Sequence, residues 1–76
     1  MAAWRPLKRR EFIRKLRARG FEGLFSGTRH QFTVLGQQRQ TIPSNSEFSV
    51  PQDRLLVRQV EAIRERPLTL EEWNSL

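Results

Sequence analysis

The chain has 76 residues, a formal net charge of +6 and no cysteine. Its length predicts one small domain over residues 1–76 with a thin core, because so short a chain buries only about 60% of its unfolded surface. Without cysteine there are no disulfide bonds or thiolate metal sites, and a lone histidine argues against zinc, so we expect no metal ion and no cofactor. Apolar runs are too short for a signal peptide or a membrane span, so we expect a cytoplasmic protein with no membrane partner.

The positive charge is concentrated at one end of the sequence. Residues 1–20 hold eight basic and one acidic residue, a net charge of +7, whereas residues 21–43 carry +1 and residues 44–76 carry −2. A solvated helix face would also be rich in cations, but concentration in one segment favours an anionic partner such as RNA. The exposed cations that we expect to contact RNA are Lys8, Arg10, Arg14 and Arg17.

A helix is predicted over residues 6–19, with Pro6 in its first turn, where no backbone N–H is needed. Its apolar stripe consists of Phe12, Ile13 and Leu16. Gly20 follows the last turn as a left-handed cap requires, and Phe21 is then expected to pack back on a residue such as Leu16.

Three short strands follow, over residues 22–26, 30–35 and 39–42, with a turn at Ser26-Gly27-Thr28. A two-residue loop at Gly36-Gln37 would split the apolar residues between the two faces of the sheet. A three-residue loop, Gly36 to Gln38, pairs Phe32 with Ile42 and Val34 with Gln40, and so places Phe32, Val34 and Ile42 together on the core face. We therefore expect the longer loop, with His30 at the rim between sheet and helix.

A second helix is predicted over residues 50–65. It would begin with a capping box, Ser49-Val50-Pro51-Gln52, and end before Pro67. Its apolar residues are Leu56, Val60 and Ile63, with Leu55 beside them. A second capping box, Thr69-Leu70-Glu71-Glu72, opens a short helix whose Trp73 should fold back on the core. The expected fold class is α+β, a three-stranded antiparallel sheet with helices on one face.

The single histidine lies in Gly27-Thr28-Arg29-His30-Gln31-Phe32. Imidazole titrates close to neutral pH, so His30 is the candidate catalytic residue. Gly27 permits close approach of a ligand, while the Thr28 hydroxyl and the planar Arg29 cation suit a phosphate. The alternative is structural: a glycine that makes a turn, a threonine in a β-rich context and a solvated arginine.

Metal-assisted nuclease chemistry needs clustered carboxylates, which the central segment lacks. A metal-independent endoribonuclease can instead use the 2′-OH of RNA as the nucleophile, with His30 as the base and Arg29 to offset charge on phosphorus. No second histidine is present to act as the acid. Phe12, Phe21 and Phe32 fall on core stripes, so we interpret them as core rather than as base-stacking platforms. Trp4 either stacks on a base or covers the start of the helix.

Motifs in a fixed order along nearly the whole chain resemble the HicA-like (YcfA-like) mRNA interferase toxins. They are Leu7-Lys8-x-x-Glu11-Phe12-Ile13, then Leu16 and Gly20-Phe21, then Gly27-Thr28-Arg29-His30-Gln31-Phe32, then Thr41-Ile42-Pro43 and Leu70-Glu71-Glu72-Trp73. The resemblance implies a double-stranded-RNA-binding-domain-like fold and an mRNA endonuclease of a toxin–antitoxin system, neutralised by a HicB-type antitoxin. It also implies that His30 is catalytic.

Two positions depart from that pattern. Many members have His-His where this chain has Arg29-His30, and many have Gly-Thr at the start of the second helix, where this chain has Gln52-Asp53. A non-catalytic RNA-binding module of the same fold is therefore the alternative function. A protein-interaction domain whose cations meet an acidic partner is a third.

Overall fold

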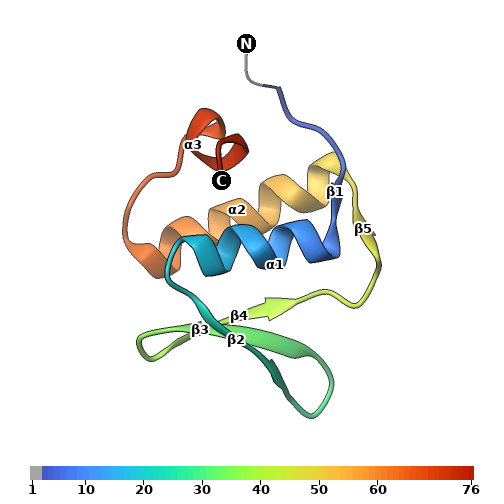
Figure 1. Ribbon diagram of the computed structural model, residues 1–76, viewed down its shortest axis with the longest axis vertical. Coiled ribbons are helices and arrows are strands. Elements are labelled where there is room, and N and C mark those ends of the chain that lie inside the picture. Colours follow the sequence, from blue (N-terminus) through green and yellow to red (C-terminus); the bar gives the residue numbers. More distant parts are fainter. Residues whose placement is uncertain (1–2) are drawn as a thin grey trace.

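The computed structural model describes residues 3–76 and is an α+β structure (Figure 1). Along the chain the elements are β1 (Leu7–Lys8), α1 (Arg9–Ala18), β2 (Glu22–Ser26), β3 (Gln31–Leu35), β4 (Gln38–Ile42), β5 (Glu47–Phe48), α2 (Val50–Arg64) and α3 (Leu70–Asn74). Strands β2, β3 and β4 form an antiparallel sheet in that order, while β1 and β5 form a separate two-stranded ribbon.

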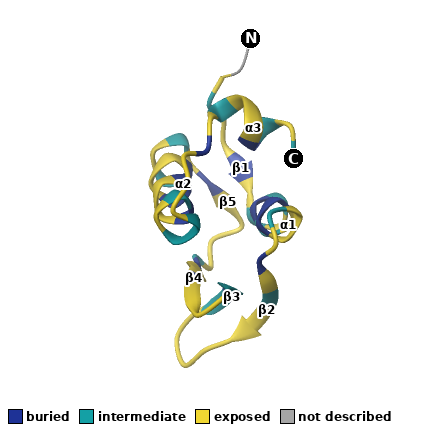
Figure 2. Ribbon diagram, turned by 90° about the vertical axis from the view of Figure 1, so that its left-hand side faces the viewer, coloured by how far each residue is buried: buried dark blue, intermediate teal, exposed yellow. Residues whose placement is uncertain are grey.

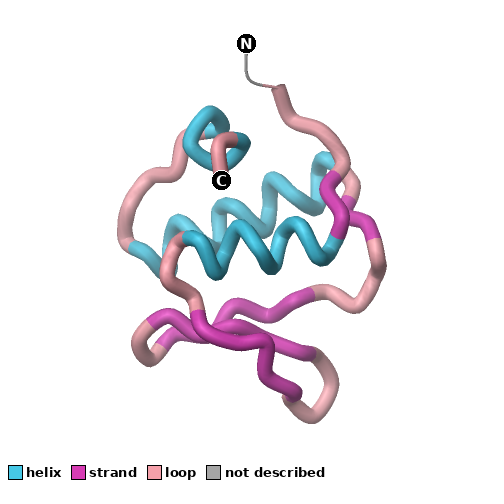
Figure 3. Tube along the Cα trace, in the orientation of Figure 1, coloured by secondary structure: helices cyan, strands magenta, loops and turns pink. Residues whose placement is uncertain are grey.

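Helices α1 and α2 lie side by side over one face of the three-stranded sheet (Figures 1 and 2). The other face of the sheet carries no helix. Helix α3 packs on the far side of the two long helices from the sheet, and the β1–β5 ribbon joins the start of α1 to the segment before α2 (Figure 3). The core lies between the three helices and the inner face of the sheet.

Helix α1 begins later than the sequence predicts, at Arg9 rather than at residue 6. Pro6 is not in its first turn, because Leu7 and Lys8 form β1 and pair with Phe48 and Glu47 of β5. The reason is burial, since Leu7 and Phe48 both belong to the core. The predicted end of the helix is confirmed.

The cap of α1 is of the Schellman type. Gly20 has a φ of +95°, and its N–H donates to the carbonyl oxygen of Arg17, while the N–H of Phe21 donates to that of Leu16 over 3.1 Å. Phe21 is buried, as predicted. This cap turns the chain sharply from α1 into β2.

The predicted register of the β3–β4 hairpin is wrong. Phe32 pairs with Thr41 and Thr33 with Gln40, so the connection is the two-residue loop Gly36-Gln37. Gly36 has a φ of +61°, and glycine in the first position of a two-residue loop is typical of a type II′ turn. Turn geometry therefore outweighs apolar patterning at this hairpin.

Phe32 and Val34 consequently point away from the helices and do not join the core with Ile42. The inner face instead buries Thr33, Gln40 and Ile42. The buried polar group on β4 has a partner on α2, since the side-chain amide of Gln40 donates to Gln59 Oε1 over 2.9 Å. The interpretation of Phe32 as a core residue is therefore wrong, whereas Phe12 and Phe21 are buried as predicted.

The predicted starts of the two later helices are confirmed. Ser49 Oγ accepts from the Gln52 N–H at the start of α2, although the Gln52 side chain bonds to Asn45 instead of closing the box. Thr69 and Glu72 form the complete capping box of α3. Leu55, predicted to lie beside the apolar residues of this helix, is 57% exposed. Val57 is buried instead, next to Leu56 and Val60.

Aromatic rings form the centre of the core. The Phe12 ring lies 5.4 Å from Phe48 and 5.6 Å from Trp73, centre to centre, and so joins α1 to β5 and α3. Trp73 is buried as predicted. Trp4 also packs against the core, with the Arg54 guanidinium 5.9 Å from its ring centre.

Candidate functional site

The segment that carries the histidine is the loop Gly27-Thr28-Arg29-His30 between β2 and β3, and all four residues are exposed. The Gly27 N–H donates to the carbonyl oxygen of His30 over 3.0 Å and closes the loop. A Cβ at Gly27 would come within 2.6 Å of that oxygen, so the turn itself requires glycine. The loop thus presents Thr28, Arg29 and His30 together to solvent.

His30 immediately precedes β3. Its predicted position at the rim between sheet and helix assumed that Phe32 faces the helices, and Phe32 faces the opposite way. The loop instead adjoins the uncovered face of the sheet, because the Phe32 ring comes within 3.5 Å of the Cβ position at Gly27. A ligand can therefore approach His30 from solvent along that face.

Arg9 connects the start of α1 to this loop, and sequence reasoning missed it. Its guanidinium donates to Gln31 Oε1, next to His30, and its Nε donates to the carbonyl oxygen of Pro43 over 2.9 Å. Its own N–H donates to the carbonyl oxygen of Ser46. The sequence signal is its place on the apolar stripe of α1, which turns a cation inward. Arg9 thereby links the start of β3, next to the 27–30 loop, and the 43–46 segment to the start of α1, along one side of the molecule (Figure 1).

The four cations predicted from α1 and its approach are all exposed and lie in overlapping grooves, one lined by Lys8, Arg10 and Arg14 and another by Arg10, Arg14 and Arg17. Lys8 and Arg10 also line a groove with Arg9, with Ser44 and Ser46 of the neighbouring loop, and with one carboxylate, Glu47. Arg9 links this groove to the His30 loop, because its guanidinium donates to Gln31, the residue after His30.

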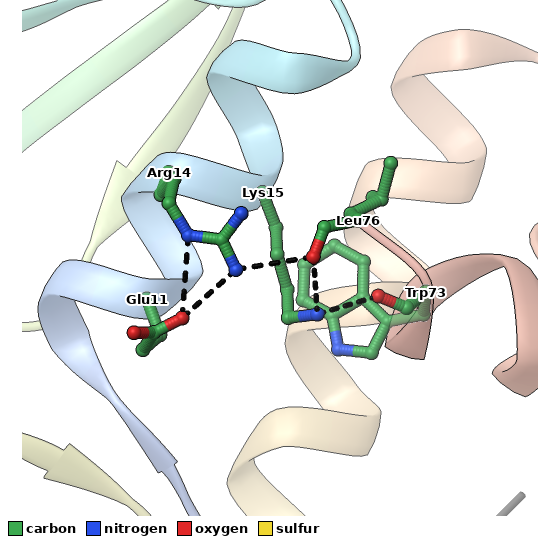
Figure 4. A network of polar contacts seen from close by, with 5 residues as sticks. All are labelled: Glu11, Arg14, Lys15, Trp73 and Leu76. Carbon is green, nitrogen blue, oxygen red and sulfur yellow. Dashed lines mark hydrogen bonds and ion pairs between the residues drawn. The ribbon is translucent and has the colours of Figure 1, made fainter.

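Arg14 is directed elsewhere. Its guanidinium pairs with Glu11 at 2.9 Å and donates to the carbonyl oxygen of Leu76 over 3.0 Å (Figure 4). That places it toward α3, on the side of the helices away from the sheet (Figure 1). Arg17 shares a groove on α1 with Arg10 and Arg14. Arg10 therefore belongs both to the groove with Lys8 and Arg9 and to the surface that carries Arg14 and Arg17.

A second feature that sequence reasoning missed is a pair of buried charged side chains between α1 and α2. Lys15 is 3% exposed and Asp53 is 2% exposed. The Lys15 ammonium donates to the carbonyl oxygen of Trp73 over 2.6 Å, near the end of α3 (Figure 4). Asp53 shares a helical stripe with Leu56 and Val60, which is the signal that its side chain faces inward.

Burial shifts the proton affinity of both groups. It raises the pKa of Asp53 to about 6, against the opposing attraction of the Lys15 ammonium. The indole N–H of Trp73 faces the same carboxylate and also acts to lower this pKa, without completing a hydrogen bond. Burial lowers the pKa of Lys15, and the nearby cation of Arg14 acts in the same direction. This pair lies in the core, so we assign it to the scaffold.

Within residues 3–76, no group of three or more histidine, cysteine, aspartate or glutamate side chains is placed to hold a metal ion. None of the helices in this part of the chain is long and apolar enough to cross a bilayer. Comparisons with models of protein families, with curated proteins and with solved structures found no match to this chain.

Proposed function

We propose that this chain is a small metal-independent endoribonuclease that cleaves mRNA, with His30 as the residue that moves the proton. One observation carries the proposal: a loop closed by Gly27 presents His30 and Arg29 side by side to solvent. Further support is the hydrogen bond from Arg9 to Gln31, which brings one cation of α1 next to the His30 loop.

In the proposed reaction the neutral imidazole of His30 takes the proton from a ribose 2′-OH, and the 2′-oxygen attacks the adjacent phosphorus. The bond from phosphorus to the 5′-oxygen breaks, and the departing oxygen takes a proton from water. Arg29 offsets negative charge on the phosphoryl oxygens, and Gly27 and Thr28 help to seat the phosphate. The products are a 2′,3′-cyclic phosphate and a free 5′-hydroxyl.

The fold and the partner belong to the same proposal. We propose a double-stranded-RNA-binding-domain-like arrangement of the HicA-like kind, supported by the order of α1, the three sheet strands and α2. A HicB-type antitoxin would block substrate entry most simply by covering the 27–30 loop and the groove at Lys8 and Arg10. The cell compartment proposed for this reaction is the cytoplasm.

RNA cleavage in EDTA tests the mechanism. Wild-type protein and an Arg66→Gln control, altered at an exposed cation beyond the end of α2, should release 2′,3′-cyclic phosphate ends. His30→Ala should abolish that product, and Arg29→Gln should slow its release by about 100- to 1,000-fold, the range for loss of a charge-stabilising donor. Equal cleavage by wild type and His30→Ala would overturn the proposal, as would cleavage that requires Mg²⁺ or yields 5′-phosphate ends.

The non-catalytic RNA-binding module is the second candidate, and one observation favours it. Among the hydrogen bonds made within residues 3–76, none orients the imidazole of His30, whereas a general base is usually held by a neighbouring group. In that case RNA binding would be salt-sensitive, no RNA would be cut, and His30→Ala would bind as well as wild type.

A further inference from the structure

The uncovered face of the three-stranded sheet is unusually aromatic and basic for a surface exposed to solvent. Register places Phe25 beside Phe32, Val34 beside Arg39, and Phe32 beside Thr41 on this face. Phe25 is 45% exposed, and neither Phe32 nor Val34 packs against the core. Exposed apolar clusters of this kind commonly mark a binding surface.

The two aromatic rings on this face lie close together, and an arginine side chain lies against one of them. The ring centres of Phe25 and Phe32 are 5.7 Å apart at an angle of 39°, and the Arg39 guanidinium lies 4.6 Å from the centre of the Phe32 ring. Two phenyl rings and a planar guanidinium provide flat surfaces on which unpaired bases stack, and stacking of this kind tolerates any base. We call Phe25, Phe32 and Arg39 the stacking face.

Charge at the stacking face favours a nucleic acid over a protein partner of mixed charge. Arg39 lies on the face and Arg29 lies in the adjoining loop, and both are exposed. The one carboxylate on this face, Glu22, pairs with Val34 at the start of β2, whereas the 27–30 loop follows the other end of that strand. Arg39 also pairs with Val34, so its charge and that of Glu22 offset each other at that end of the face, and Arg29 leaves a net positive charge at the end beside His30.

The stacking face is continuous with the candidate active site. The Phe32 ring borders the Cβ position at Gly27, and Gly27 is bonded to the carbonyl oxygen of His30. A nucleotide whose base rests on Phe25 and Phe32 would therefore have its ribose and phosphate beside the 27–30 loop. Bases inside a duplex are covered by their neighbours and cannot stack in this way.

We propose that the stacking face binds unpaired bases of single-stranded RNA and positions the adjoining phosphodiester at the His30 loop. This inference rests on the proposed function, because it names the class of RNA that reaches that site. Double-stranded RNA would bind more weakly, through backbone contacts alone.

Binding measured without cleavage tests the stacking face. The probe is a fluorescein-labelled oligouridylate of about ten nucleotides, within the site sizes of known single-strand platforms, and all proteins carry His30→Ala. Adding Phe25→Ala should weaken binding by about 5- to 100-fold, the loss expected when one stacked base loses its platform. Adding Arg39→Gln should weaken binding and reduce the slope of log affinity against log salt by about 0.7. A duplex of the same length should be insensitive to Phe25→Ala.

Leu55→Ala is the matched control, because Leu55 is an exposed apolar residue that belongs to α2 and not to the sheet. It should leave oligouridylate binding unchanged. Unchanged affinity in Phe25→Ala, or an equal loss in Leu55→Ala, would overturn the inference. So would dissociation of a dimer by Phe25→Ala with RNA affinity intact, since the face would then contact a second copy of the chain.

The same variants separate this inference from the proposed function. If wild type does not cut RNA but Phe25→Ala still weakens binding of the single strand, the stacking face stands and the endonuclease fails. If His30→Ala abolishes cleavage and Phe25→Ala in the His30 protein changes neither KM nor kcat, the endonuclease stands and the stacking face fails.

Discussion

Lys15 on α1 donates a hydrogen bond of 2.6 Å to the main-chain oxygen of Trp73 on α3, and its ammonium lies 5.4 Å from the centre of the indole (Figure 4). The cation thus reaches the C-terminal end of a helix, where backbone carbonyl groups lack partners within the helix. The Lys15 side chain of α1, the most basic helix, therefore helps to hold α3 over the core.

Replacement of Lys15 by methionine should lower the free energy of unfolding by about 1 to 3 kcal/mol, because the Trp73 carbonyl would lose its charged donor and keep only the weaker contact of 3.4 Å from the Leu76 N–H. Methionine keeps most of the side-chain volume, so the change isolates the polar contact. Urea denaturation followed by tryptophan fluorescence measures it. Arg17→Met, on an exposed part of α1, should change stability by less than about 0.5 kcal/mol. A gain in stability for Lys15→Met would show that desolvation of the ammonium outweighs its contacts.

The free energy of unfolding of this protein should depend on pH because of the buried Asp53 carboxyl. Burial raises the pKa of this carboxyl from 3.8 to about 6, so the folded protein holds the proton more tightly than the unfolded chain. Its contribution to stability is therefore complete below about pH 4 and is lost as the pH rises through 6, by no more than about 3 kcal/mol. Asp53→Asn should remove this decline, seen as a flatter plot of unfolding free energy against pH.

Glu72→Gln provides a control of opposite sign. Hydrogen bonds from Thr69 lower the pKa of Glu72, so its contribution is present above the unfolded pKa and lost as the pH falls. This variant should change the profile at and below about pH 4.5, the unfolded pKa of Glu72, and leave the decline through pH 6 that Asp53→Asn flattens. Parallel pH profiles for wild type and Asp53→Asn would contradict the assignment of the buried carboxyl.

Gly27→Ala should distort the loop that presents His30. The new methyl group would lie 2.6 Å from a backbone oxygen that cannot rotate away. We expect a loss of about 1 to 3 kcal/mol in stability, within the range for backbone strain at a constrained site. Any RNA cleavage should fall with it.

Gly36→Asn is the comparison for that experiment. Gly36 has a φ of +61° with no atom within 4 Å of its Cβ position, and asparagine tolerates this conformation. This change should cost under about 1 kcal/mol. Comparing the melting temperatures of Gly27→Ala and Gly36→Asn tests this prediction. Equal values would show that the close contact between the new methyl group and the His30 carbonyl oxygen is easily relieved.

Features set by neighbouring residues could be predicted from the sequence. The left-handed Gly20, the Thr69–Glu72 box and the buried Phe12 each depend on a few adjacent positions or on one helical period. The loop around His30 was also located, because a lone histidine beside glycine and arginine is visible without any structure. The α+β class followed from the order of these elements.

Features set by distant segments could not be predicted. Leu7 forms a strand only because Phe48 comes beside it, and nothing near residue 7 reveals that partner. Asp53 and Lys15 are buried because each lies on an apolar helical face, although charge alone suggested exposure. The predicted register of the β3–β4 hairpin was wrong because turn geometry outweighed the preference of Phe32 for the core. That error concealed the stacking face.

The irregularity in β2 bears on whether another chain can add a strand to this sheet. Strand β2 is at the edge of its sheet, and its pairing with β3 slips between Glu22 and Phe25, around the φ of +132° at Gly23. An edge with regular hydrogen-bonding groups invites another chain to add a strand and begin an aggregate, above all where Leu24 and Phe25 are exposed. The bulge bends that edge out of line, so neighbouring molecules find no straight template for growth into fibrils.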